Sequence, residues 1–239
     1  MGIGCKLGIL SSNIIAYADD LVLLAPSAEG LQKLIDKAYN EALDIDLKFN
    51  YKKTKCIVFK LKPGDEYKNI KPFTIDSHNI DFVRSFRYLG YIISSDLNSN
   101  DDIVRARNKF YAQFNMLLRN FHFSDTHVQM FLFRQFCLQI YGCELWYNCS
   151  FSKTLFKGFE VGYHKAVKKI LKLSYHESNH FACQEAQVFT FRHFIHKCKI
   201  MAAFRVLSKP CHFIHKILDF FYGIIHFFKR CLLYFKRFL

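Results

Sequence analysis

The spacing of hydrophobic and polar positions changes along this chain, from strand-like in the first part to helical in the second. In residues 14–25, IIAYADDLVLLA, two apolar arms rich in β-formers surround Ala18-Asp19-Asp20. This pattern predicts a strand, a tight turn and a second strand. A helix is predicted to begin at Pro26-Ser27 with Ser27 as its N-cap. Its apolar stripe consists of Leu31, Leu34, Ile35, Ala38 and Ala42.

Shorter extended segments follow this predicted helix. Residues 54–60 predict a strand, residues 62–72 a turn-rich connection containing Pro63-Gly64, and residues 73–83 a short hairpin. Tyr88 to Ser94 predicts one more strand, which carries a glycine. The first part of the chain is therefore expected to be a mixed α/β domain with antiparallel hairpins, ending near residue 95.

Helical spacing takes over after residue 100. Its first apolar positions are Ile103, Ala106, Phe110, Phe114, Leu117 and Phe121. Further helices are predicted at 126–141, 153–173 and 185–208. In the 153–173 helix, Phe156, Phe159, Tyr163 and Ile170 are expected inside, with Lys165, Lys168, Lys169 and Lys172 outside.

Charge separates the same two parts. The formal net charge is +14 with a pI near 9.3, which indicates a polyanionic partner, nucleic acid first and an anionic membrane second. Residues 1–95 hold 13 Lys and Arg against 11 Asp and Glu, whereas residues 96–239 hold 21 against 9. The second part also contains 22 of the 27 Phe. A soluble helical domain with a basic, solvated face would give the same composition.

The cysteines and the N-terminus indicate the compartment. The nine cysteines include no CxxC pair, so free thiols in a reducing compartment are expected. The apolar stretch after Lys6 is interrupted by Ser11-Ser12-Asn13 and Asp19-Asp20, unlike a signal peptide or a membrane span. We therefore expect an intracellular protein, nuclear or cytoplasmic, without a transmembrane span.

Two adjacent carboxylates on an apolar hairpin require compensation, because each repels the other and resists burial. At an exposed tip, Asp19 and Asp20 could bind a divalent ion, as carboxylates do in phosphoryl-transfer enzymes that use two Mg²⁺ ions. An ordinary solvated turn is the alternative, since Asp favours turns.

An ordered set of motifs resembles the reverse transcriptases of non-LTR (LINE-type) retrotransposons. Tyr17-Ala18-Asp19-Asp20 resembles their YxDD motif, and the segment Gly4-Cys5-Lys6-Leu7-Gly8 looks like the hairpin strand before it. Phe49-Asn50 with Lys53-Thr54-Lys55 is similar to the next palm motif, N-x-x-K-T. Phe86-Arg87-Tyr88-Leu89-Gly90 resembles the primer grip, F-x-Y-L-G, and Tyr141-Gly142-Cys143-Glu144-Leu145-Trp146 resembles a downstream YGxExW box. The resemblance covers residues 2 to about 180.

The resemblance implies roles for individual residues. Asp19 would be a ligand of Mg²⁺ with Asp20 as its acidic neighbour, and Tyr17 would lie beneath the primer terminus. Lys53, or less favourably Lys55, would act as general acid or electrostatic partner for departing pyrophosphate. Tyr88, Leu89 and Gly90 would hold the primer 3′ end. An ordinary core strand would also account for these last three residues.

The resemblance also implies a fold and partners. The fold would be α+β: residues 1–95 the C-terminal half of a polymerase palm with an antiparallel sheet, 96–150 a helical thumb, and 151–239 a basic helical extension. The partners would be an RNA template with a DNA primer, and dNTP in the complete enzyme. Phosphate contacts are predicted for Arg105, Lys109, Lys165, Lys168 and Lys172, although these cations could equally form a solvated face.

One departure from the family pattern bears on activity. The family uses a further metal-binding aspartate, fingers and a nucleotide-selecting loop, all upstream of the YxDD hairpin. Only sixteen residues precede Tyr17, and none is Asp or Glu. We therefore expect a truncated element copy or a partial gene model that does not polymerise by itself.

Two other segments suggest different functions. His176-Glu177-Ser178-Asn179-His180 matches the HExxH pattern of zinc metallopeptidases, but the residues before it resemble a helix end and no third ligand is evident. Residues 213–239 form a basic amphipathic pattern that could bind a membrane surface or a partner helix. A non-enzymatic nucleic-acid or membrane-associated module is therefore the main alternative.

Overall fold

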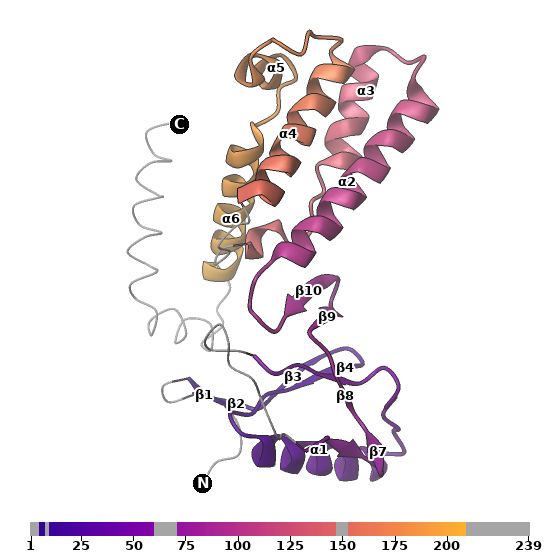
Figure 1. Cartoon of the computed structure of the whole chain (residues 1–239), viewed down its shortest axis with the longest axis vertical. Coiled ribbons are helices and arrows are strands. Elements are labelled where there is room, and N and C mark those ends of the chain that lie inside the picture. The colour runs from indigo at the N-terminus through magenta and orange to yellow at the C-terminus, as the bar shows by residue number, and fades with distance from the viewer. Residues whose placement is uncertain (1–4, 8–9, 60–70, 147–152, 209–239) are drawn as a thin grey trace. The chain divides into compact units, whose positions relative to one another are not determined.

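The computed structural model describes residues 5–7, 10–59, 71–146 and 153–208 (Figure 1). These residues form two compact units. The first contains residues up to Cys56, residues 71–82 and the last few residues of the final described helix, and the second contains 57–59, 83–146 and 153–203. The boundary after Phe82 lies earlier than the predicted residue 95, because the hairpin that follows packs on the first helix of the second unit.

The acidic motif of the first unit lies on a β-hairpin, as predicted. Strands β1 (Cys5–Leu7) and β2 (Leu10–Ser12) pair antiparallel, and β3 (Ile14–Tyr17) pairs with β4 (Asp20–Leu23). Tyr17 is opposite Asp20 in the register, so Ala18 and Asp19 form a two-residue turn. The Leu24 N–H donates to the Asn13 carbonyl at 2.8 Å and closes the base of this hairpin.

Helix α1 (Ala28–Leu43) confirms the predicted helix and its cap, since the Ser27 hydroxyl accepts from the Gly30 N–H at 3.2 Å. Leu34, Ile35 and Ala42 are buried. Gln32 joins the helix to strand β6 (Thr74–Ile75) by two hydrogen bonds, accepting from the Thr74 N–H at 3.1 Å and donating to its carbonyl at 3.0 Å. The buried Phe73, Ile75 and Ile80 complete the apolar interior of the first unit.

The remaining strands of the first unit are short. Strands β6 and β7 (His78–Asn79) form the predicted hairpin at 73–83. The strand predicted at 54–60 is limited to β5 (Lys55–Cys56) among the described residues, because its parallel partner β8 (Asp81–Phe82) offers only two pairing residues. Most of the predicted connection at 62–72 lies outside the described residues.

The second unit begins with a hairpin where the sequence predicted a single strand from Tyr88 to Ser94. Strand β9 (Ser85–Tyr88) pairs antiparallel with β10 (Tyr91–Ser94). Leu89 and Gly90 form the two-residue turn and both have positive φ, +46° and +85°. A type I′ turn requires this backbone at both positions, which glycine adopts readily. The glycine therefore reverses the chain instead of interrupting a strand.

The rest of the second unit is helical. Its helices are α2 (Asn100–Phe121), α3 (Thr126–Leu132), a π-helical turn (Phe133–Cys137), a 3₁₀ turn (Cys143–Leu145), α4 (Lys153–Ile170), α5 (Asn179–Glu185) and α6 (Phe191–Leu207). Two predicted helices differ from this. The 126–141 helix ends at Cys137, and the 185–208 segment has a turn with Gln187 at φ +53° before α6 begins.

Aromatic side chains from four segments fill the core of the second unit. The central rings are Phe110 of α2, Phe133 of the π-turn, Phe159 and Tyr163 of α4, and Phe191 of α6. The predicted inward positions of the helix around 153–173 are confirmed for Phe159, Tyr163 and Ile170. No helix in the described part of the chain is long and apolar enough to cross a membrane. The amphipathic segment predicted at 213–239 lies outside the described residues.

Candidate metal hairpin, primer-grip turn and basic groove

The acidic tip of the β3–β4 hairpin is open to solvent. Asp19 and Asp20 are exposed, and 63% of the Tyr17 side chain is accessible. Ala18 holds the turn with φ +51°, a left-handed conformation that costs an L-residue energy and is used where a chain reverses sharply. Two carboxylates on consecutive residues are therefore presented at the tip of a hairpin.

The donor set of this tip suits a hard divalent cation. Carboxylate oxygens are the ligands that Mg²⁺ prefers, and Mg²⁺ usually binds one or two carboxylates together with waters and substrate phosphates. Within the described ranges, no cluster of three or more His, Cys, Asp or Glu could hold a metal ion. The hairpin tip supplies two carboxylate side chains, those of Asp19 and Asp20.

The two candidate lysines of the N-x-x-K-T segment differ in their contacts. Asn50 shapes the loop, because its carbonyl and side-chain oxygens accept from the Lys53 N–H at 3.1 and 3.2 Å, which leaves the Lys53 side chain exposed. The Lys55 ammonium instead forms an ion pair with Asp81 at 2.5 Å. Lys53 is therefore the better candidate for a phosphate contact. In the described part of the chain, no contact joins its side chain to Asp19.

The three predicted primer-grip residues are not equivalent. Leu89 and Gly90 form the turn of the β9–β10 hairpin, with the Leu89 side chain exposed. The hydroxyl of Tyr88 is enclosed by protein without a hydrogen-bond partner. The turn is thus accessible to a ligand, whereas the Tyr88 hydroxyl is not, and the primer contact expected of the half-buried Tyr88 stays a prediction.

A buried carboxylate, which sequence reasoning missed, holds this hairpin on the helical unit. Asp102, in the first turn of α2, is 0% exposed. One of its oxygens accepts from the Ile92 N–H of β10 at 3.2 Å and from Arg105 Nε at 2.6 Å. The other accepts from the Trp146 indole N–H at 2.8 Å. A buried charge needs such partners. Ile92 lies on β10, Arg105 lies one turn further along α2, and Trp146 follows the 3₁₀ turn.

The YGxExW box completes this arrangement. Arg105 Nη2 donates to the Tyr141 carbonyl at 3.0 Å, and the Tyr141 hydroxyl donates to the Leu89 carbonyl at 2.9 Å. Gly142 has φ +83°, and a Cβ there would lie 2.8 Å from the Tyr91 ring. Only glycine therefore fits at this position. We call Ile92, Asp102, Arg105, Tyr141 and Trp146 the Asp102 cluster.

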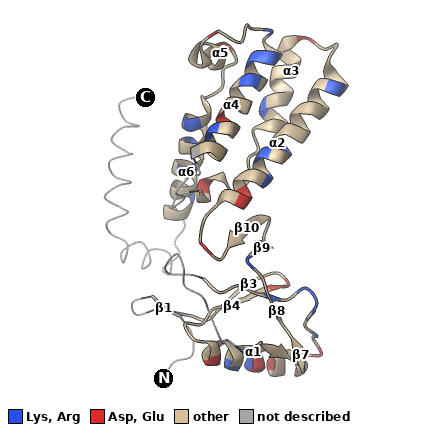
Figure 2. Cartoon of the chain, in the orientation of Figure 1, with Lys and Arg blue, Asp and Glu red and all other residues tan. Residues whose placement is uncertain are grey.

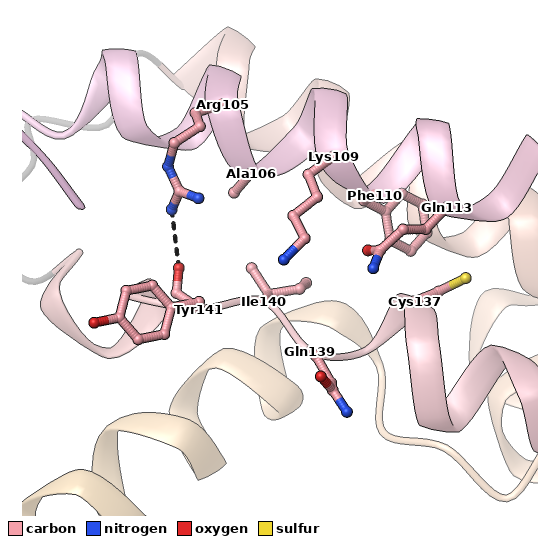
Figure 3. Close-up of a pocket in the computed structure, with 9 residues that line it drawn as sticks. All are labelled: Arg105, Ala106, Lys109, Phe110, Gln113, Cys137, Gln139, Ile140 and Tyr141. Carbon is pink, nitrogen blue, oxygen red and sulfur yellow. Dashed lines mark hydrogen bonds between the residues drawn. The ribbon is translucent and has the colours of Figure 1, made fainter. Parts of the chain in front are cut away.

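A small cavity lies beside the Asp102 cluster, between α2 and the segment after the π-turn (Figure 3). Its volume is about 10 Å³, which is close to the space that one water molecule needs. The polar side chains that line it are Arg105, Lys109, Gln113 and Gln139. The cavity is too small for a nucleotide or a cofactor. Two of its lining residues, Arg105 and Tyr141, instead form the contacts that support the turn.

A thiol in the same box is not available for chemistry. Cys143 is buried, and a hydrogen bond with Cys198, followed by desolvation, raises the pKa of its thiol far above the usual range. A protonated thiol is a poor nucleophile and a poor metal ligand. Cys143 is therefore a packing residue in the core of the second unit.

The predicted phosphate-binding residues separate into two groups. Lys109, Lys165 and Lys172 are exposed. Arg105 instead donates to Asp102 and to the Tyr141 carbonyl. Lys168, expected on the outer face, is only 9% exposed, and its ammonium donates to the Tyr175 carbonyl at 3.0 Å. The chain folds back over this lysine after α4. A helical projection of the sequence shows only the residues of the helix, so it does not predict this burial.

An open groove between α2 and α4 was also missed by sequence reasoning. Its volume is about 570 Å³, and its lining consists of Tyr111, Thr154, Lys157, Gly158, Val161, Gly162 and Lys165. Gly158 is exposed in this lining, whereas Gly162 is buried against Tyr111, since a Cβ there would lie 1.9 Å from the Tyr111 hydroxyl. Arg107 approaches the same lining, 3.8 Å from the Cβ position of Gly158. We call this the α2–α4 groove, and Figure 2 shows the Lys and Arg residues along both helices.

The HExxH segment does not have the geometry of a zinc site. His176 and Glu177 precede helix α5, whose N-cap is Ser178, whereas His180 lies in its first turn. The two histidines are thus not one turn apart on a single helix, as the motif requires. The zinc alternative is therefore wrong on the described geometry, because serine at this position caps a helix instead of continuing one.

Comparison with known proteins gives one informative similarity. The chain is 27% identical over 106 residues to a retrovirus-related Pol polyprotein from the type-1 retrotransposable element R1 of Nasonia vitripennis. The match covers 41% of this chain and 32% of that protein, so this chain corresponds to about a third of its relative. No family model and no solved structure matches the chain. The similarity supports an origin in a retrotransposon.

Proposed function

We propose that this chain is derived from the reverse transcriptase of a LINE-type retrotransposon and carries its metal-binding hairpin, primer-grip turn and helical thumb. The observation that carries the proposal is the solvent-exposed Tyr17-Ala18-Asp19-Asp20 tip on an antiparallel hairpin. The similarity to a retrotransposon Pol polyprotein supports it independently. The reaction of the complete enzyme would be template-directed addition of deoxynucleotides to a primer 3′-hydroxyl.

Each part of the first unit has a defined task in this proposal. Asp19 and Asp20 would hold Mg²⁺, which when bound would neutralise phosphate charge and lower the pKa of the primer hydroxyl. The exposed Tyr17 ring would support the terminal base pair by stacking. Lys53 would place its ammonium near the departing pyrophosphate, since Lys55 is already paired with Asp81.

The second unit would bind the template–primer duplex through its backbone. The α2–α4 groove suits this task because Lys157 and Lys165 supply positive charge and the exposed Gly158 has no side chain to hinder close approach. Tyr111 and Thr154 add hydroxyl groups that can donate to phosphate oxygens. We propose these groove residues as phosphate contacts in place of Arg105 and Lys168, whose cationic groups already donate to acceptors within the protein.

Divalent metal is expected to bind at the hairpin tip. In the full chain, Mn²⁺ should broaden the amide resonances of residues 17–21 before all others, with excess Mg²⁺ reversing the effect. Asp19→Asn should abolish the broadening, because it removes one of two charged oxygen ligands. NMR spectra of the labelled protein measure this directly.

Asp46→Asn provides the matched control for this experiment. Asp46 is also an exposed aspartate at a turn, with φ +57°, and the substitution should leave the broadening at the tip intact. If Mn²⁺ broadens the signals around Asp46 as strongly as those around Asp19, the tip is an ordinary acidic turn and the catalytic ancestry of the hairpin loses its support.

Duplex binding is expected to depend steeply on salt through the α2–α4 groove. The double substitution Lys157→Ala and Lys165→Ala should reduce the slope of log K against log salt by about two, since each phosphate contact contributes about 0.9 for a B-form duplex. Fluorescence anisotropy with an RNA/DNA hybrid at several salt concentrations measures the slope.

The control for this measurement removes two exposed lysines elsewhere. Lys33 and Lys37 are exposed on α1, and replacing both by alanine changes the net charge equally. An equal loss of slope in both double variants would show diffuse attraction by the basic protein instead of a defined groove. A slope near zero in the unmodified chain would refute duplex binding altogether.

A further inference from the structure

We propose that Tyr141 and Asp102 are positioning residues that fix the Leu89–Gly90 turn for contact with a primer 3′ end. This inference rests on the proposed function, and it concerns how the second unit presents the turn. Both residues act through other groups and neither is assigned a contact with the primer. A continuous series of contacts runs from the buried carboxylate to the turn.

The turn is held at its backbone. The Tyr141 hydroxyl donates to the Leu89 carbonyl at 2.9 Å, across 52 positions of sequence. The same ring lies beside Gly90, with its Cε1 atom 3.2 Å from where a Cβ would be. One aromatic side chain thus fixes both residues of the turn, by a hydrogen bond on one and by close packing on the other.

Tyr141 in turn is fixed from behind. Its carbonyl accepts from Arg105 at 3.0 Å, and the next residue, Gly142, packs against the ring of Tyr91 in the same hairpin. Arg105 is oriented by its ion pair with Asp102 at 2.6 Å. Because Asp102 also accepts from the backbone of β10, the carboxylate holds both the hairpin and the residue that contacts its turn.

The exposure of these groups argues for a role beyond folding. The Asp102 carboxylate is fully buried, whereas Tyr141 is 56% exposed and uses its hydroxyl on a turn that is itself open to solvent. Leu89 holds φ +46°, which costs an L-residue energy, so the hydrogen bond from Tyr141 to its carbonyl stabilises the turn itself. Because Tyr141 is anchored through Arg105 on α2, the same contact restricts where the turn lies relative to α2, which is the property that binding a primer end would require.

The test compares two ligands of the full-length chain. One is an RNA/DNA hybrid with a recessed primer 3′ end, and the other is the same hybrid closed by loops at both ends. The ratio of their Kd values, measured by anisotropy, reports recognition of the primer end separately from backbone binding. The unmodified chain should prefer the recessed end by about fivefold, roughly what one well-placed hydrogen bond provides.

Tyr141→Phe keeps the ring and removes only the hydroxyl. It should bring the ratio close to one while leaving the Kd for the closed hybrid unchanged. Hydrogen exchange of the Gly90 and Tyr91 amides in the free protein should become faster, because the turn is less restricted. Tyr175→Phe is the matched control: this tyrosine is exposed in the same unit, and both readouts should stay unchanged.

Asp102→Asn provides a second, independent variant. Its side-chain amide can accept through one oxygen only, so either the Trp146 or the β10 and Arg105 contacts are lost. The single indole N–H resonance of Trp146 should shift, and the end preference should fall as it does in Tyr141→Phe. A shifted resonance in a folded chain with an intact end preference would overturn the role of Asp102.

The outcomes separate the inference from the function it rests on. If the unmodified chain binds both hybrids equally, primer-end recognition is refuted and the proposed function fails at this turn. If it prefers the recessed end and Tyr141→Phe keeps that preference, the function stands and the positioning role is overturned. If Tyr141→Phe weakens the binding of both hybrids equally, Tyr141 contributes to duplex binding in general, and its positioning role is again overturned.

Discussion

Replacing Asp102 by alanine should lower the free energy of unfolding of the helical unit by about 3–5 kcal/mol, the range for breaking a buried ion pair. The substitution leaves the Arg105 guanidinium, 19% exposed, without its carboxylate. It also leaves the Trp146 indole N–H and the Ile92 N–H without their acceptor. Buried donors without partners account for most of the cost.

Asp101→Ala is the matched control for Asp102→Ala. Asp101 is the preceding residue in the same first turn of α2, where both acids face the positive end of the helix dipole. Asp101 is exposed, and among the described residues its side chain makes only a long contact with Ser94 at 3.4 Å. Its removal should cost no more than about 0.5–1 kcal/mol.

Urea unfolding followed by Trp146 fluorescence measures both aspartate variants, because the chain has one tryptophan and it is buried in the Asp102 cluster. A shift in the urea midpoint without a change in the m value reports a change in the free energy of unfolding alone. Equal small shifts for Asp101→Ala and Asp102→Ala would show that the cluster contributes little and that the helix dipole accounts for both.

Phe110→Ala should destabilise the same unit by about 3–5 kcal/mol, the range for removing a phenyl ring from a well-packed core. Phe110 is 1% exposed, and its ring contacts those of Tyr111, Phe114, Phe133, Phe159 and Tyr163. The loss combines the transfer of apolar surface with a cavity that the surrounding rings cannot fill, because Phe133, Phe159 and Tyr163 are anchored on other elements.

Phe123→Ala serves as the control for Phe110→Ala. Its side chain is 76% exposed just after α2, so truncation should change stability by less than about 0.5 kcal/mol. Thermal unfolding followed by far-ultraviolet circular dichroism measures both variants. Comparable losses would mean that the aromatic cluster is loosely packed and that the helices are held by other contacts.

Local pattern was sufficient for much of the fold. The apolar arms around Asp19-Asp20 predicted the β3–β4 hairpin, and Ser27 predicted the start of α1. The helical spacing of Ile103, Ala106, Phe110, Phe114 and Leu117 predicted the buried face of α2. These features depend on residues within one or two turns of each other, where propensity, capping and periodicity act directly.

The candidate site was predicted only where motifs are contiguous. The acidic tip is exposed, as its predicted role requires, and Leu89 and Gly90 lie at an accessible turn. The interpretation of Tyr88 to Ser94 as one strand was wrong, because strand propensity alone does not distinguish a strand with a glycine from a two-residue I′ turn. The polymerase palm and thumb assignments stay predictions.

The roles of the charged residues were decided by tertiary contacts. Lys168 is covered by the chain that follows α4, and Arg105 is paired with a carboxylate three positions earlier that also accepts from Trp146. Gly162 gains significance only because Tyr111 of α2 lies against it. In a sequence, these lysines, arginines and glycines look the same as those on a solvated helical face.

By itself the sequence determined the elements, their caps, the positive charge and the acidic hairpin, because each of these follows from near neighbours along the chain. Only the tertiary structure decided which cations remain free, where Asp102 finds its three donors and how the YGxExW box meets the Leu89–Gly90 turn. The physical reason is that burial, hydrogen bonding and ion pairing join segments far apart in the sequence, 52 positions for Tyr141 and Leu89, whose approach no local pattern contains.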